Sequence, residues 1–215
     1  MRHLSGMPAA GEWFCEMESG EHSRMSYDAQ MEHRRLGEGL LFLILFGLTI
    51  PAANWLIGHA GTACIPEGPC VIPVAPGVMA PSGVTMIGFA LVLRDLLQRR
   101  LGIGIAAAAI VAGAALSALI APPSLVIASA AAFFMSELTD FAVYTPLARR
   151  RLVAAVIASS MAGIVVDSVL FLWLAFGSLE FLPGQIIGKA WMVVLSVPLI
   201  AWLRRRDERL GITPA

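Results

Sequence analysis

Two acidic residues lie inside an apolar stretch of the chain, where charged side chains are rare. Glu137 and Asp140 are three residues apart within residues 125–144. In a helix this spacing places both carboxylates on one face, together with Phe133 and Tyr144. A charged residue at the centre of a bilayer costs roughly 2.5–3.5 kcal/mol, so it normally faces a protein interior or a water-filled cavity. The pair therefore predicts an intramembrane site.

Further polar residues lie on two later apolar stretches. Asp167 follows Ser159 and Gly163 at four-residue intervals, so the acid shares a helix face with small side chains. Gln185 and Lys189 are also four residues apart and form a polar stripe. Counting about 1.5 Å per residue from the outer ends of the stretches places Lys189 roughly 9 Å deep and Asp167 roughly 13 Å deep. These depths allow the two residues to pair.

Arg94 and Asp95 stand near the end of an earlier stretch. The same count places Glu137 at roughly 21 Å, and Asp140 and Arg94 at roughly 25 Å, so we expect a second charged layer. In one alternative, an acid pairs with Arg94 only to fix helix packing. In another, the side chains of Arg94 and Asp95 extend to the cytoplasmic membrane–water interface. Four acids face two bases, so the cavity is acidic unless a buried carboxylate carries a proton.

The composition predicts an integral membrane protein. Of the 215 residues, 58% are hydrophobic and 14% are charged, and the mean hydropathy is +0.77. This is too apolar for an ordinary soluble domain. We expect an all-α bundle of six transmembrane helices, because six stretches approach the roughly 20 apolar residues that cross a bilayer. The stretches are residues 39–57, 77–97, 102–120, 123–147, 152–176 and 183–203.

Arginines cluster in alternate connections. They occur at positions 34–35, 99–100, 149–151, 204–206 and 209, whereas the loops 58–76, 121–122 and 177–182 contain no Lys or Arg. The positive-inside rule then places both termini in the cytoplasm and requires an even number of spans. We expect three regions: a polar, disordered cytoplasmic tail over 1–35, the transmembrane domain over 36–204, and a short cytoplasmic tail over 205–215.

Two cysteines lie in the first outer loop. Cys64 and Cys70 are on the side of the membrane where disulfides persist, so they form either a disulfide or two free thiols. We expect no metal site, because only His59 is nearby. The other histidines also lie outside the spans, so a nucleophile there would lack a general base, and we expect no enzyme.

Three consecutive segments carry a resemblance to a known family. They are SELTDFAVYTPLARRR at 136–151, ASSMAGIVVDSVLFLWLAFG at 158–177 and PGQIIGKAWMVVLSVPLI at 183–200. Together they resemble the VUT family, the queuosine precursor transporters of bacteria, over residues 78–203. The resemblance implies a six-helix importer of 7-cyano-7-deazaguanine and 7-aminomethyl-7-deazaguanine in the bacterial inner membrane, similar in fold to vitamin-binding S-components.

The matching motifs also imply a ligand set. A carboxylate could accept the N–H groups of a guanine-like edge, Gln185 or Lys189 could meet its carbonyl oxygen, and an aromatic ring could stack on the base. The implied substrate-binding residues are Glu137, Asp140, Asp167, Gln185 and Lys189, with Arg94, Asp95, Phe133, Tyr144 and Trp191 in supporting positions.

The expected partners are a small-molecule substrate and the lipid bilayer. We expect no nucleic acid and no cofactor, and a homo-oligomer is left open. One alternative function is an S-component that binds a vitamin or nucleobase and works with a separate ATP-driven module. Another is a structural protein without a ligand.

Overall fold

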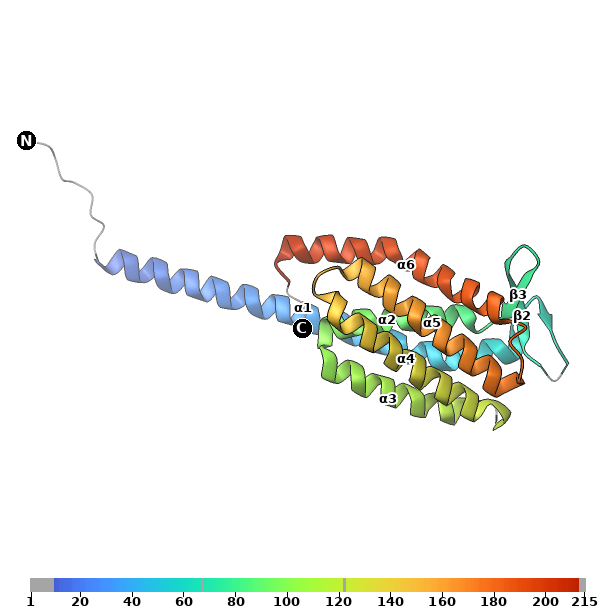
Figure 1. The fold of residues 1–215 in the computed structure, drawn as a ribbon. Coiled ribbons are helices and arrows are strands. Elements are labelled where there is room, and N and C mark those ends of the chain that lie inside the picture. The colour runs from blue at the N-terminus through green and yellow to red at the C-terminus, as the bar shows by residue number, and fades with distance from the viewer. Residues whose placement is uncertain (1–9, 67, 122, 213–215) are drawn as a thin grey trace, which may run out of the picture.

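Six helices form the bulk of the residues that the structure, a computed structural model, describes. These residues are 10–66, 68–121 and 123–212, with 10–29 and 124 described by their backbone alone. The helices run side by side in a bundle, and α1 projects from one end of it (Figure 1). They are α1 (Ala10–His59), α2 (Val84–Leu101), α3 (Ile103–Ile120), α4 (Val126–Ala148), α5 (Leu152–Phe176) and α6 (Leu182–Leu210).

Five of these helices are long and apolar enough to cross a membrane, namely α1 from Gln30 onward, α3, α4, α5 and α6. The remaining helix, α2, carries Arg94, Asp95, Arg99 and Arg100 within 18 residues, and most of its side chains are buried. It packs against α1 and α6 inside the bundle. The structure therefore supports an all-α membrane protein, while the crossing by α2 as a sixth span stays a prediction.

A small antiparallel sheet closes one end of the bundle (Figure 1). Its strands are β1 (Ala63–Cys64), β2 (Cys70–Ala75) and β3 (Val78–Pro81), and a disulfide joins Cys64 to Cys70. Strand β3 corrects the predicted second span, because the chain stays extended through Pro81 and the helix begins only at Val84. The physical reason is that Pro81 disfavours a helical conformation in the residue before it.

Helix α1 begins inside the segment predicted as a disordered tail. The structure has residues 10–35 as helix. This segment contains no proline, and its Glu, Met, Arg and Ala residues favour helix. The disorder and cytoplasmic location expected for the tail stay predictions. At the other end, α6 continues as a helix to Leu210. Residues 1–9 and 213–215 of the predicted tails lie outside the described residues.

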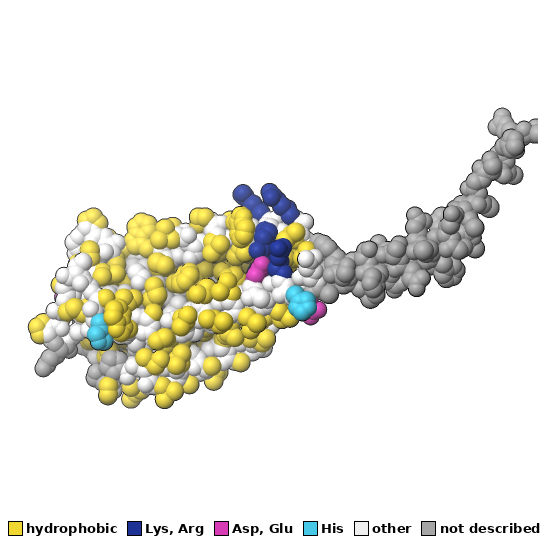
Figure 2. Space-filling model, turned by 180° about the vertical axis from the view of Figure 1, so that it is seen from behind, with side chains coloured by type: hydrophobic (Ala, Val, Ile, Leu, Met, Phe, Trp, Pro, Cys, Tyr) yellow, Lys and Arg dark blue, Asp and Glu magenta, His cyan; other side chains and the backbone are white. Residues whose placement is uncertain are grey.

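Arginine side chains gather at the end of the bundle from which α1 projects (Figure 2). Arg100 contacts Glu38 and Asp207, each at 2.9 Å, and so joins α2 to both α1 and α6. Arg206 adds a second contact to Glu38 at 2.6 Å. Arginines from separate connections of the sequence thus lie together at one end of the bundle. The cytoplasmic orientation of that end stays a prediction.

Candidate functional site

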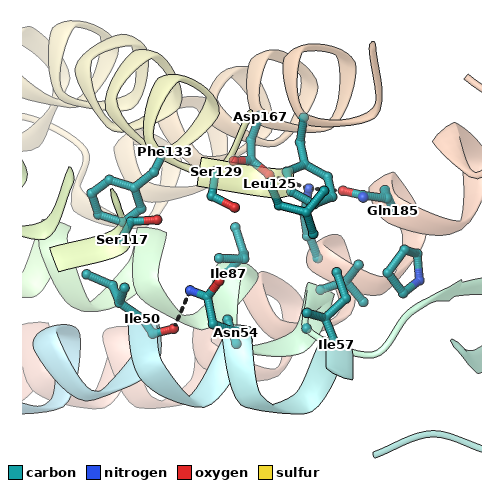
Figure 3. Close-up of a pocket in the computed structure, with 16 residues that line it drawn as sticks. Ile50, Asn54, Ile57, Ile87, Ser117, Leu125, Ser129, Phe133, Asp167 and Gln185 are labelled. Atoms are coloured by element: carbon teal, nitrogen blue, oxygen red, sulfur yellow. Dashed lines mark hydrogen bonds and ion pairs between the residues drawn. The ribbon is translucent and has the colours of Figure 1, made fainter. Parts of the chain in front are cut away.

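A cavity opens between the helices in the half of the bundle that adjoins the sheet (Figure 3). It is lined by 16 residues and is partly open to the outside. Sites for small molecules are typically concave and largely apolar, with a few polar groups. This cavity has the same character. Its polar lining residues are Asn54, Ser117, Ser129, Asp167, Gln185 and Lys189, and the others are mostly aliphatic or aromatic.

Asp167, Gln185 and Lys189 form the polar wall of the cavity, and Lys189 contacts the other two. Its ammonium group is buried and donates to Asp167 Oδ2 at 2.5 Å and to Ser168 Oγ at 2.9 Å. It also donates to Gln185 Oε1. An ammonium group has three N–H donors and no acceptor, so all three donors have partners within the protein. Lys189 therefore holds its neighbours in place and has no donor left for a ligand.

The contact with Lys189 fixes how Gln185 is oriented. Because the ammonium can only donate, the amide oxygen of Gln185 must face it and the amide nitrogen must point elsewhere. Within the described residues, no hydrogen bond joins the protein to Gln185 Nε2 or to Asp167 Oδ1. Both side chains line the cavity. The wall thus offers one N–H donor and one carboxylate acceptor.

Glycines bring the Gln185–Lys189 turn of α6 close to its neighbours. A Cβ at Gly88 of α2 would lie 2.5 Å from the backbone oxygen of Lys189, and one at Gly184 would clash with the backbone of Met79. Small residues of this kind let backbones approach closely in a membrane protein. The close approach of α2 and β3 to α6 therefore positions the polar wall.

The opposite side of the cavity is built by α1, α3 and α4. Asn54 points into the cavity from α1, across from Ser129 and Asp167 (Figure 3). Phe133 lies beside Ser117, and its ring packs at 5.9 Å from that of Phe46. These residues present a flat apolar surface flanked by hydroxyl and amide groups.

A second cluster of charges lies deeper in the bundle. The guanidinium group of Arg94 contacts Asp95 Oδ1 at 2.9 Å, Glu137 Oε2 at 3.2 Å and Asp140 Oδ2 at 2.6 Å. It also donates to Gln98 Oε1 at 3.2 Å. The four charged side chains are essentially inaccessible to solvent. This arrangement is a closed ion cluster that joins α2 to α4.

The structure separates the predicted site residues into three groups. Asp167, Gln185, Lys189 and Phe133 line the cavity. Glu137, Asp140, Arg94 and Asp95 form the closed cluster, with Tyr144 placing its ring 5.7 Å from the guanidinium carbon. Trp191 is half-exposed, and its indole N–H donates to Val74 O at 3.1 Å. The structure does not bring the last two groups to the cavity.

Sequence reasoning missed Asn54, Ser117 and Ser129. Asn54 is the one amide in the apolar run 39–57, and Ser129 lies four residues before Phe133 on the same helix face. Both signals were present in the sequence. Among the side chains that the structure describes, no group of three His, Cys, Asp or Glu residues could hold a metal ion.

The bundle defines the class of the protein as a multi-pass α-helical membrane protein. Residues 118–203, which contain α4, α5 and most of α6, match the family described as "Putative vitamin uptake transporter". The match supports a membrane transporter of small molecules and favours a role other than that of an enzyme. No curated protein and no solved structure matches the chain.

Proposed function

We propose that this protein imports queuosine precursors, 7-cyano-7-deazaguanine and 7-aminomethyl-7-deazaguanine, across the bacterial inner membrane. The family match supports uptake of a small molecule. The three motifs that resemble the queuosine precursor transporters support the narrower substrate class. Two of those motifs contain the residues of the polar wall, Asp167, Gln185 and Lys189.

The observation that carries the proposal is the pair of open polar groups on the cavity wall. Asp167 Oδ1 can accept hydrogen bonds, and Gln185 Nε2 can donate one. A 7-deazaguanine presents ring and exocyclic N–H donors next to a carbonyl oxygen. The carboxylate suits the donors and the amide suits the carbonyl, so the two side chains complement one edge of the base.

The apolar part of the cavity suits the rest of such a ligand. Phe133 supplies an aromatic face for a planar ring, and such stacking contributes about 1–3 kcal/mol per base. Asn54 and Ser129 are placed to meet a substituent on the far edge. A planar 7-deazaguanine base would thus be held by two directed polar contacts and one stacking surface.

A second candidate is a substrate-binding component that works with a separate ATP-driven module. The description of the matching family names a vitamin as the substrate class, which suits the ligand of such a component and does not bear on its dependence on a module. The same cavity would then hold a vitamin or a nucleobase. The two candidates differ in whether the chain transports without a partner.

The test is uptake of labelled 7-cyano-7-deazaguanine by liposomes that contain the purified full chain alone. We expect saturable uptake that unlabelled 7-aminomethyl-7-deazaguanine inhibits and thiamine does not. Binding without uptake would support the second candidate. Neither binding nor uptake of either 7-deazaguanine would contradict the proposed substrate class.

A further inference from the structure

The closed ion cluster carries more negative than positive charge. Three carboxylates, those of Asp95, Glu137 and Asp140, contact the single guanidinium of Arg94. With every group ionised, three negative charges and one positive charge would leave a net charge of −2 away from water. A buried charge without a partner is costly, and such a group normally becomes neutral by binding a proton. The imbalance therefore calls for added positive charge.

No second cation contacts these carboxylates among the side chains that the structure describes. Lys189 is bound to Asp167, and Arg99 and Arg100 are bound to Asp207. The apolar part of α1, residues 39–58, and the whole of α3 contain no titratable side chain. Positive charge added to the cluster must come from outside the described protein groups, and one proton would change its net charge from −2 to −1.

Unpaired polar atoms mark where the proton fits. Asp140 Oδ1 is buried without a hydrogen-bond partner, and so is the hydroxyl of Tyr144, four residues further along α4. Asp95 and Asp140 contact Nη1 and Nη2 of Arg94, two nitrogens on the same carbon, so both carboxyl groups lie against one guanidinium group. A proton on either one would create an O–H donor among these acceptors.

The cluster lies next to the cavity along two helices. On α4, Phe133 lines the cavity, and Glu137, about 6 Å further along the axis, contacts Arg94. On α5, Asp167 lines the cavity, and Ser159, two turns away, donates to Asp95 Oδ2 at 3.1 Å. Movement of α4 or α5 around a ligand would therefore alter the contacts of the cluster.

We propose that Asp95 and Asp140 share one proton and that this proton is transported together with the substrate. The proposal rests on the proposed function, because it assigns the driving ion for the same uptake. An O–H bond forms on a carboxylate when the proton enters from one side of the membrane, and it breaks when the proton leaves on the other. No electron transfer is involved.

The first test observes the proton directly. Infrared spectra of the full chain at neutral pH should contain a carbonyl band of a protonated carboxyl group. That band should disappear in Asp140→Asn and persist in Glu180→Gln, in which an exposed acid outside the cluster is neutralised. The neutral amide of Asn mimics a protonated carboxyl, so this variant should fold. Asp95→Asn serves as the second variant.

The second test measures coupling in liposomes that contain the full chain and labelled 7-cyano-7-deazaguanine. An imposed proton gradient should drive several-fold accumulation, which a proton ionophore abolishes. Asp140→Asn should lose this accumulation and keep the exchange of internal for external substrate. Glu180→Gln should behave as the unaltered chain does.

The outcomes separate the two proposals. Exchange of substrate without any response to the proton gradient would overturn the coupling and leave the proposed function intact. Absence of any exchange would contradict the proposed function, and the infrared band alone would then decide whether the cluster holds a proton. A spectrum without that band would overturn the proton site.

Discussion

Asp167 on α5 and Lys189 on α6 form an ion pair of 2.5 Å at the wall of the cavity, although 22 residues separate them in the chain. The pair is buried, and Ser168 and Gln185 satisfy the remaining donors of the ammonium group. It fixes two helices relative to each other and leaves one carboxylate oxygen of Asp167 open. The same contact thus serves both packing and the proposed recognition of substrate.

Removal of one member of this pair should destabilise the protein. Lys189→Met leaves the Asp167 carboxylate buried without its cation, which typically costs about 3–5 kcal/mol. The double variant Asp167→Asn/Lys189→Met removes both charges, so it should recover most of this stability. Unfolding of the purified variants in detergent measures the effect. Equal stability of Lys189→Met and the unaltered chain would contradict the buried pair.

Phe133 should matter for binding, whereas its neighbour Phe134 should not. Phe133→Leu removes the stacking surface of the cavity and should weaken binding of 7-cyano-7-deazaguanine roughly 5- to 150-fold, from about 1–3 kcal/mol of stacking. Phe134 is partly exposed and outside the cavity lining, so Phe134→Leu is a matched control. Equal affinities of the two variants would exclude Phe133 from the site.

Arg94 should not be replaceable by lysine. Its planar guanidinium contacts three carboxylates and Gln98 at once, and an ammonium group cannot reproduce this geometry. We expect Arg94→Lys to lose about 1.5–3 kcal/mol of stability, the contribution of a hydrogen bond to a charged group. Arg205→Lys changes an exposed arginine and should stay within about 0.5 kcal/mol. Thermal unfolding of both variants in the same detergent checks this, and equal losses would contradict the role of the cluster.

The arrangement of the spans can be tested with single cysteines. In a background whose native cysteines are serine, a membrane-impermeant thiol reagent should label Glu180→Cys in intact cells. Glu208→Cys, at the arginine-rich end, should be labelled only after lysis. This result follows from the positive-inside rule and places α5 and α6 as consecutive spans. Labelling of both positions in intact cells would contradict the predicted orientation.

Much of the helical framework could be predicted from sequence. The fifth predicted span and α5 have the same limits, residues 152–176, because arginines precede the helix and Gly177 ends it with a positive φ. The second span was less predictable, since β3 pairs with β2, which precedes it in the chain. Such pairing depends on contacts across a turn and leaves no hydropathy signal.

The site was predictable only in part. Depth along a helix follows from counting residues, so the separate layers of Asp167 and Asp140 could be expected. The rotation of each helix about its axis determines which of these charged residues faces the cavity. Counting residues gives no information about that rotation. For this reason the sequence left open whether Asp140 contacts the ligand or only Arg94, and in the structure it contacts Arg94. Asn54 was missed because α1 carries no other polar group at that depth.

Recognition of a 7-deazaguanine should depend on the open carboxylate of Asp167 and the amide of Gln185. Its most direct test is equilibrium binding of labelled 7-cyano-7-deazaguanine to the purified chain and to Asp167→Asn/Lys189→Met, with Glu180→Gln as control. We expect the double variant to bind at least about tenfold more weakly, because a hydrogen bond to a charged group contributes about 1.5–3 kcal/mol. Unchanged affinity in a folded double variant would exclude the Asp167 carboxylate from substrate recognition.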